Sequence, residues 1–261
     1  MSRKTASFVT LDVFTGNAFA GNKLAVVKIE KGHLSKAQKQ SIARQFNFSE
    51  TVFLDYADPS DLPRLEIFTP VNEMDFAGHP VTGTDRVLFR QLLKDLPSPI
   101  ADSIEAMTLL TPAGPIALRY DPASQVVSAG IPHNAHLHSK PIPMHRLGVT
   151  YALVDLTNTP DIFDAVSAGP SPFIDLDDGW SPSFTGTMYY FDTSRARLEQ
   201  DMAIQDLCVR MVAIGLEDPA CGSGSAALVA CLALRDGRKD GKYRFNFDQG
   251  MEIGIQSYIT V

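Results

Sequence analysis

The sequence has few of the features that mark specialised classes of protein. Its three cysteines, Cys208, Cys221 and Cys231, are an odd number without CxxC spacing, which fits free thiols in a reducing cytosol better than a disulfide framework. No apolar run approaches the roughly 18–20 residues that cross a bilayer. No apolar signal-peptide core follows the basic residues near the N-terminus. We therefore expect a cytoplasmic protein that does not enter a membrane.

Clusters of lysine and arginine are also absent. The net charge is −7, and without a basic patch this disfavours nucleic acid as a partner. The apolar content of 44% and the charged content of 20% are those of an ordinary globular protein. A chain of 261 residues is long enough for one large domain or two small ones.

What the sequence does contain is a pair of glycine-containing segments, each followed by an apolar helical pattern. They are FAGHPVTG at 76–83 and DPACGSGS at 218–225. A helix N-terminus has backbone N–H groups without partners and a partial positive charge, so each segment is a candidate anion site. Either one alone reads as an ordinary loop-to-helix turn. Their presence in both halves of the chain predicts a cleft in which both helices point at one carboxylate.

The predicted elements repeat in the two halves of the chain. Each half runs through several strands, one long apolar helix and a strand pair, which indicates an internal duplication. The second helix, 225–234, is apolar on nearly every side, so we expect it inside a layer of strands. The sequence thus predicts two similar α+β domains, at 1–120 and 121–249, each with a central helix wrapped by a sheet. Ser35 is expected to cap a further helix that ends near Phe46.

Two residues of the first half are candidates for proton transfer. Glu50 stands at the entry to an apolar strand, where desolvation raises a carboxyl pKa towards neutrality. The alternative is a solvated glutamate at a strand edge. His79 stands at a helix start, where the macrodipole favours a neutral imidazole that can hydrogen-bond at a reacting centre. The alternative is a capping or packing histidine.

The second half offers an acid and a thiol at the corresponding place. Asp218 precedes the second helix and could be its cap or a further acid/base, and propensity favours the cap. Cys221 could be a base or nucleophile, because a helix N-terminus lowers a thiol pKa. A two-thiol mechanism needs a second cysteine, and the matching residue of the first half is Ala77. Cys208 and Cys231 are expected to be small apolar packing residues.

Three histidines lie close together at positions 133, 136 and 138. Their spacing matches no standard set of metal ligands, and no carboxylate or thiol joins them. We therefore expect no metal and no cofactor.

Several motifs, taken together and in order, resemble the phenazine biosynthesis-like (PhzF-like) family. They are Asp12-Val13-Phe14-Thr15, Phe19-Ala20-Gly21-Asn22, Asn47-Phe48-Ser49-Glu50-Thr51, Phe68-Thr69-Pro70, Phe76-Ala77-Gly78-His79-Pro80, Glu217-Asp218-Pro219-Ala220, Gly222-Ser223 and Gln249-Gly250. The set is specific although no single motif is. The resemblance implies the diaminopimelate epimerase fold, which has two pseudo-symmetric domains, each a mixed β-sheet wrapped around a central helix. It also implies an active site between the domains and a final strand, about 250–261, that joins the first domain.

The resemblance implies a cofactor-free isomerase that moves a proton on a small carboxylate-bearing metabolite, and commonly a homodimer. Glu50 resembles the family's general acid/base. His79, Asp218 and Ser223 resemble the surrounding polar groups. Backbone donors for the substrate carboxylate are implied at four residues, Gly78, Gly222, Ser223 and Gly224. Fixed N–H donors would stabilise the negative charge that builds up when the proton leaves.

Three departures keep other functions open. Cys221 stands where many relatives have threonine, the chain is somewhat short, and 141–182 matches poorly. The first hypothesis is an isomerase that uses Glu50. The second is an amino-acid racemase or epimerase that uses Cys221 with Glu50 or a water opposite, and the third is a metabolite-binding protein without catalysis. The sequence favours the first, because Glu50, His79 and Asp218 are all retained.

Overall fold

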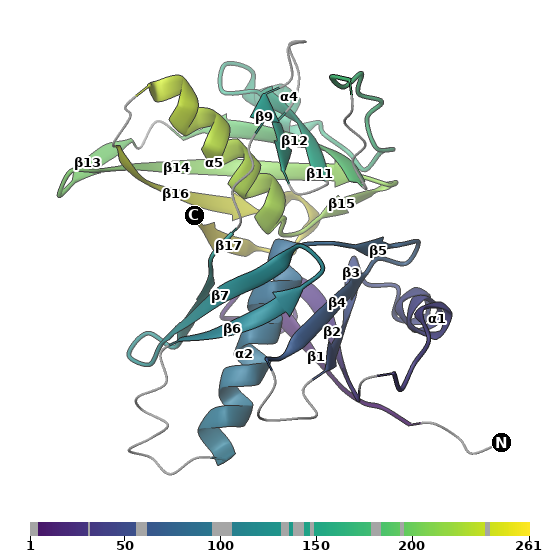
Figure 1. Ribbon diagram of the computed structural model, residues 1–261. Coiled ribbons are helices and arrows are strands. Elements are labelled where there is room, and N and C mark those ends of the chain that lie inside the picture. Colours follow the sequence, from purple (N-terminus) through teal and green to yellow (C-terminus); the bar gives the residue numbers. More distant parts are fainter. Residues whose placement is uncertain are drawn as a thin grey trace. The chain divides into compact units, whose positions relative to one another are not determined.

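A computed structural model of the chain shows two compact units (Figure 1). It describes residues 5–30, 32–55, 62–95, 106–131, 136–137, 144–146, 149–178, 184–193, 196–237 and 241–261. One unit comprises Met1–Val13 and Lys23–Pro132, and the other comprises Phe14–Asn22 and His133–Val261. Among the helices described, none is both long enough and apolar enough to span a lipid bilayer.

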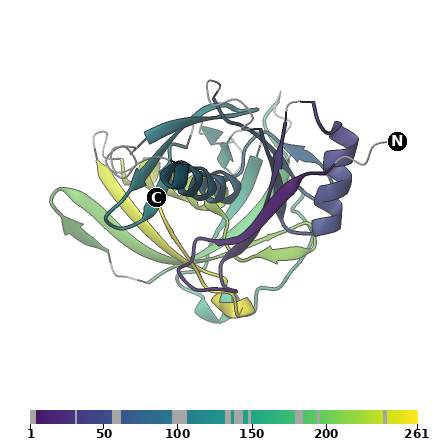
Figure 2. The same cartoon turned by 90° about the horizontal axis from the view of Figure 1, so that it is seen from below.

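The first unit is a mixed sheet of eight described strands that curls around a helix (Figure 2). The order is β1-β2-β3-β4-β6-β7-β8, with β5 paired to β4. The pairs β2/β3 and β4/β6 are parallel, and β3/β4, β6/β7 and β7/β8 are antiparallel. The strands are β1 Ser7–Val13, β2 Asn22–Ile29, β3 Glu50–Asp55, β4 Arg64–Phe68, β5 Glu73–Met74, β6 Ala106–Thr111, β7 Gly114–Asp121 and β8 Val126–Ala129.

Two helices cover opposite faces of this sheet. Helix α1, Lys36–Phe46, has Ser35 as its N-cap, as the sequence predicts, and Ser35 forms a capping box with Gln38. Its Ala43 packs with Phe53 and Phe68 in an apolar cluster. Helix α2, Gly78–Asp95, lies on the other face, inside the curl.

The buried face of α2 contains one acidic side chain. Asp85 is fully buried, one turn from Val81, Leu88 and Phe89, which are at most 1% exposed. Neither of its carboxyl oxygens has a hydrogen-bond partner among the described residues. Burial raises the pKa of Asp85 to about 8. This carboxyl group is therefore mostly protonated at neutral pH.

The second unit is also a mixed sheet, with nine described strands in the order β17-β16-β14-β12-β11-β10-β9, and with β13 and β15 paired to β14. The pairs β11/β12 and β14/β16 are parallel. Its strands are β9 His136–Leu137, β10 Met144–Arg146, β11 Val149–Asp155, β12 Phe184–Asp192, β13 Arg197–Glu199, β14 Met202–Ala213, β15 Leu216–Asp218, β16 Lys242–Gln249 and β17 Ser257–Thr260.

Helix α5, Gly222–Asp236, is the central helix of this unit. It contacts β10, β11, β12 and β16. Its first seven residues and Cys231 are buried, which confirms the interior position expected from its apolar sequence. The short helix α4, Pro160–Asp164, follows β11, and a 3-10 turn at Met251–Ile253 precedes β17.

The two units repeat the same order of elements, as the sequence predicts. In the first, α1 separates the parallel strands β2 and β3, and β4, β5, α2, β6 and β7 follow. In the second, α4 separates β11 and β12, and β14, β15, α5, β16 and β17 follow, with the short strand β13 as an addition before β14. Both central helices begin four residues after a short strand that pairs with its predecessor, since Met74 precedes Gly78 as Asp218 precedes Gly222. The strand registers therefore give a residue-by-residue correspondence between the halves.

Two boundaries differ from the sequence-based expectation. The final strand β17 pairs with β16 and lies in the second unit, whereas the resemblance placed 250–261 in the first. A tight return over residues 250–256 brings β17 back along its immediate predecessor, which is the local pairing that a short connection favours. The units also divide at 132/133 instead of 120/121, because β8 still pairs with β7.

Candidate active site

Glu50 is the first residue of β3, and the end of α1 sets its position. Asn47 caps that helix in the left-handed conformation with φ of 54° and turns the chain towards the strand. Because side chains alternate along a strand, Phe53 points towards α1 and Glu50 points to the face that holds α2. The side chain of Glu50 is 13% exposed.

His79 is the second residue of α2 and lies against Glu50. Its Nδ1 atom is 3.4 Å from Oε2 of Glu50, and its side chain is 3% exposed. Both residues are candidates for proton transfer from the sequence, and the structure brings their side chains into contact within the first unit. Gly78, at the first position of α2, presents its N–H where a helix has no internal acceptor.

Burial sets the protonation of this pair. It raises the pKa of Glu50 to about 7, although a hydrogen bond from Ser49 opposes the shift. It lowers the pKa of His79 to about 3, against a hydrogen bond with the backbone of Lys23. His79 is thus neutral at neutral pH, and the contact is not an ion pair. A carboxyl group that titrates near pH 7 beside a neutral imidazole suits proton transfer in both directions.

The second glycine segment forms the N-terminus of α5. Cys221 is its N-cap, and the thiol Sγ accepts a hydrogen bond from N–H of Gly224 at 3.4 Å. The N–H of Gly224 points to this thiol, and its role as a backbone donor for a ligand stays a prediction. Gly222 and Ser223 occupy the first two helical positions, whose N–H groups have no acceptor within the helix.

Asp218 is not the helix cap that propensity favours. It ends β15, is 5% exposed, and its Oδ1 accepts hydrogen bonds from Nδ2 of Asn22 at 2.6 Å and from N–H of Ala220 at 3.1 Å. Gln249 completes the frame, since its Nε2 donates to the carbonyl of Asp218 and its Oε1 accepts from N–H of Cys221. The carboxylate is thus held by chain segments far apart in the sequence.

A buried ion pair fixes the strand that carries Asp218. Arg210 of β14 donates to both carboxylate oxygens of Glu217 at 2.8 and 2.7 Å, and the two side chains are 4% and 5% exposed. Arg210 also donates to the carbonyls of Phe163 and Asp164 at the end of α4. These bonds tie β15 to its neighbours one residue before Asp218.

Tyr151 is a polar member of this region that sequence reasoning missed. Its phenol oxygen is 2.7 Å from Oγ of Ser223 and 3.3 Å from Sγ of Cys221. The residue lies on β11, about 70 residues before its partners, and no motif marks it. Only the strand register, which the sequence does not show, reveals the contact.

The thiol of Cys221 is not activated by the helix N-terminus as its position suggested. Burial and then the nearby Asp218 raise the pKa of Cys221 to about 12, which outweighs the opposing effect of its hydrogen-bond contacts with Tyr151, Gly224 and Ser223. A thiol with this pKa is protonated at neutral pH, so it is a poor base and a poor nucleophile.

We expect Cys221 to resist alkylation in the folded protein. At pH 8, iodoacetamide should modify it roughly 10³-fold more slowly than it modifies the same residue in the urea-unfolded chain, because the thiolate is scarce and the side chain is 5% exposed. Peptide mass spectrometry over a time course measures both rates. Equal rates in the folded and unfolded chain would show a reactive thiolate.

The structure places the predicted site residues in two groups. Glu50, Gly78 and His79 belong to the first unit, and a second group belongs to the other unit, namely Asp218, Cys221, Gly222, Ser223 and Gly224. That both groups serve one carboxylate stays a prediction from the sequence.

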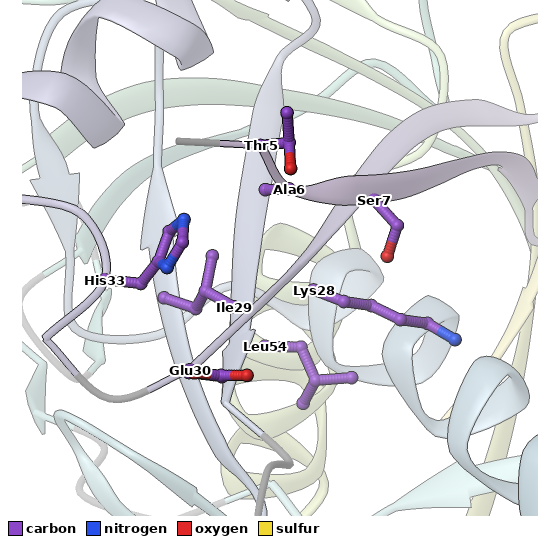
Figure 3. Close-up of a pocket in the computed structure, with 8 residues that line it drawn as sticks. All are labelled: Thr5, Ala6, Ser7, Lys28, Ile29, Glu30, His33 and Leu54. Atoms are coloured by element: carbon purple, nitrogen blue, oxygen red, sulfur yellow. The ribbon is translucent and has the colours of Figure 1, made fainter. Parts of the chain in front are cut away.

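A pocket of about 350 Å³ in the first unit contains none of these residues (Figure 3). Ser7 of β1, Lys28 of β2 and His33 contribute polar side chains around Ile29 and Leu54. Leu54 lies four residues along β3 from Glu50, or about 13 Å at the rise of a strand. This pocket is therefore separate from the Glu50–His79 pair.

The described residues contain no group of three or more histidine, cysteine, aspartate or glutamate side chains that could hold a metal ion. Of the histidine group considered from the sequence, His133 and His138 lie outside the described residues. All three cysteines are free thiols.

Comparison with known proteins gives consistent results. The phenazine biosynthesis-like protein family (PhzC-PhzF) matches residues 11–143. An uncharacterized isomerase of Mesorhizobium japonicum is 30% identical over 280 residues, which cover 99% of this chain and 90% of the relative. A trans-2,3-dihydro-3-hydroxyanthranilate isomerase of Pseudomonas aeruginosa is 39% identical over 88 residues, which cover 34% of this chain and 31% of the relative.

The fold also matches a solved structure, that of a predicted epimerase from Pseudomonas aeruginosa. The TM-score is 0.65 at 22% identity, with 98% of this chain and 91% of that chain covered. With the two curled mixed sheets and their central helices, this likeness confirms the predicted α+β architecture.

Proposed function

The chain belongs to the phenazine biosynthesis-like protein family and is an isomerase, and we propose that it uses Glu50 to move a proton on a small carboxylate-bearing metabolite. No cofactor takes part in the proposed reaction. The observation that carries the proposal is the buried contact between Glu50 and His79.

Glu50 suits both steps of such a reaction. As a carboxylate it takes a proton from a carbon next to an unsaturated acid, and the electron pair of that C–H bond moves into the conjugated system. As a carboxylic acid it then returns the proton to another carbon, so that no net oxidation occurs. A pKa of about 7 makes both forms accessible at neutral pH.

His79 is assigned a supporting role in this scheme. Its neutral imidazole lies 3.4 Å from Glu50 and adds no positive charge that would lower the carboxyl pKa. Glu50 therefore keeps a pKa close to neutrality.

We assign binding of the substrate carboxylate to the N-terminus of α5. The N–H groups of Gly222 and Ser223 point along the helix axis, where the partial positive charge favours an anion. Asp218, held by Asn22 and Gln249, orients the loop that leads into this turn. In the first unit, Gly78 supplies the corresponding donor to the proposed site.

The substrate class follows from chemistry and from one relative. Removal of a proton is easiest next to an unsaturated acid, because the resulting charge is delocalised. The relative named trans-2,3-dihydro-3-hydroxyanthranilate isomerase has such a cyclic unsaturated acid in its name. We therefore propose an unsaturated cyclic carboxylic acid of secondary metabolism as the substrate. From the family resemblance we also propose that the protein works as a cytoplasmic homodimer.

The proposal is tested by the fate of hydrogen during turnover. We expect the protein, incubated in D₂O with trans-2,3-dihydro-3-hydroxyanthranilate, to incorporate deuterium into the isomerised acid, because a carboxyl group exchanges its proton with solvent. Mass spectrometry and NMR detect the label and its position. Thermal stabilisation by this acid without any conversion or exchange would instead indicate a protein that only binds the metabolite.

A further inference from the structure

The correspondence between the two units shows how their equivalent sites differ. Phe68 and Val212 are equivalent, because each pairs with the first or second residue of the short strand before its central helix, in the same register. Their partners on the neighbouring strands are Thr51 and Thr187. The residues that precede these threonines, Glu50 and Gly186, are therefore equivalent as well. Ser223 is equivalent to His79, since each is the second residue of its helix. The second unit thus has no carboxylate at the place of Glu50.

A tyrosine takes the space that this glycine leaves. Tyr151 pairs with Gly186 in the register of β11 and β12, as Leu24 pairs with Glu50 in the first unit. A Cβ atom on Gly186 would lie 3.1 Å from Cε1 of Tyr151, and one on Gly224 would lie 3.3 Å from the same atom. The ring therefore sits in a slot between two glycines, 1% exposed.

The side chains of Tyr151, Cys221 and Ser223 meet here, and each has one proton that it can donate. The phenol of Tyr151 has one proton and lies between Sγ of Cys221 and Oγ of Ser223. Burial raises the pKa of Tyr151 well above its usual value, and the pKa of Cys221 is also raised, so both groups keep their protons at neutral pH. If Cys221 donates to Tyr151 and Tyr151 donates to Ser223, the hydroxyl proton of Ser223 is left to point elsewhere.

An anion bound at the start of α5 would be the acceptor for the hydroxyl proton of Ser223. The N–H groups of Gly222 and Ser223 and the helix dipole favour a negative group there, and such a group only accepts hydrogen bonds. The Ser223 hydroxyl has a single proton, so it joins these donors only when it donates neither to the Tyr151 oxygen at 2.7 Å nor to Sγ of Cys221 at 3.8 Å. In its contact with Tyr151 it is then the acceptor. Hydrogen bonds arranged in series in this way strengthen one another.

We propose that Tyr151 is a positioning residue that turns the hydroxyl of Ser223 into a hydrogen-bond donor for the substrate carboxylate, with the Cys221 thiol as the far end of the chain of donors. The inference rests on the proposed function and deepens it, since it identifies how the second unit recognises the anion. It also gives Cys221 a part other than that of a catalytic base.

The kinetic test is a double-mutant cycle with trans-2,3-dihydro-3-hydroxyanthranilate. We expect Tyr151→Phe, which keeps the ring in its slot, to raise KM about tenfold with little change in kcat, as the loss of one oriented hydrogen bond predicts. In the Ser223→Ala background the same change should raise KM less than twofold, because Tyr151 acts through the absent hydroxyl. Additive effects of the two changes would overturn the proposal.

A matched control shows whether the effect of Tyr151→Phe depends on the position of the phenol or on the loss of any buried phenol. Tyr190 on β12 is 4% exposed and its phenol donates to Asp155 at 2.9 Å, away from Ser223. Tyr190→Phe should leave KM unchanged. An increase in KM equal to that of Tyr151→Phe would show that any buried phenol matters to the same extent.

A second measurement needs neither substrate nor activity. Infrared difference spectra between the wild type and Cys221→Ala identify the S–H stretching band of Cys221. We expect Tyr151→Phe to shift this band towards that of a thiol without an oxygen acceptor. An unchanged band would overturn the chain of donors, whereas a shifted band with no turnover of the tested acid would overturn the proposed substrate alone.

Discussion

Replacing Glu50 by glutamine is expected to lower kcat/KM by roughly 10²–10⁴-fold, the contribution of a positioned acid/base group. Glutamine has nearly the same shape but neither takes up nor releases a proton at neutral pH. Deuterium incorporation from D₂O should fall in the same proportion, because both measurements follow one transfer step. Initial rates with trans-2,3-dihydro-3-hydroxyanthranilate, together with NMR of the product, give the two values.

Asp55→Asn is the matched control for this change. Asp55 ends the same strand and lies five positions from Glu50, so the alternation of a strand places it on the opposite face. Its neutralisation should leave turnover within twofold of the wild type. Full turnover in Glu50→Gln, or an equal loss in Asp55→Asn, would contradict the role given to Glu50.

The pH profile gives an independent view of the same residue. Burial raises the pKa of Glu50 to about 7, so below that pH the carboxyl group is protonated and cannot act as the base. We expect kcat/KM to rise about tenfold per pH unit up to pH 7 and then to level off. A histidine with a pKa near 3 stays neutral over this whole range and adds no further inflection.

Replacing Asp85 by asparagine is expected to stabilise the protein at alkaline pH. The folded state raises the pKa of Asp85 from 3.8 to about 8, so folding favours the protonated form. The stability linked to this proton is complete below pH 3.8 and is lost as the pH rises through 8. Between pH 6 and pH 9 the advantage of Asp85→Asn over the wild type should grow by roughly 3 kcal/mol.

Thermal melts across this pH range measure the effect. For a chain of this size, roughly 3 kcal/mol corresponds to a shift in Tm of roughly 6–12 °C. Asp161→Asn, at an exposed position of α4, should follow the wild type at every pH. A constant difference in Tm between Asp85→Asn and the wild type would mean that Asp85 keeps its ordinary pKa.

Sequence reasoning identified the pair in the first unit because its signals are local. Glu50 opens an apolar strand and His79 opens an apolar helix, and each position alone predicts a shifted pKa. The central helices and the duplication are also local in origin, since apolar periodicity and the order of elements are written along the chain.

The hydrogen-bond network around Asp218 could not be predicted from local sequence patterns. Asn22 and Gln249 appear in the family motifs, but their bonds to the Asp218 segment join positions far apart in the chain. Tyr151 contacts Ser223 only because the register of β11 brings it beside Gly186. Such registers depend on the packing of the whole sheet.

The thiol and the helix cap were misread for a related reason. The helix N-terminus lowers the pKa of an exposed cysteine, but Cys221 is 5% exposed, and desolvation is the larger effect. Because Cys221 itself caps α5, Asp218 is left to bind Asn22. The extent of burial, which decides both outcomes, is a property of the folded unit and not of the motif.

The short stretch Phe14–Asn22 belongs by its contacts to the second unit, although the residues on both sides of it belong to the first. The carbonyl of Phe14 accepts from N–H of Tyr258, and Asn22 binds Asp218. A gene fragment that starts at codon 133 would therefore encode an incomplete unit that lacks the amide partner of Asp218. The two halves can be compared as repeats, but one cut cannot separate them for expression. A nascent chain completes the surroundings of Asp218 only after Gln249 has been synthesised.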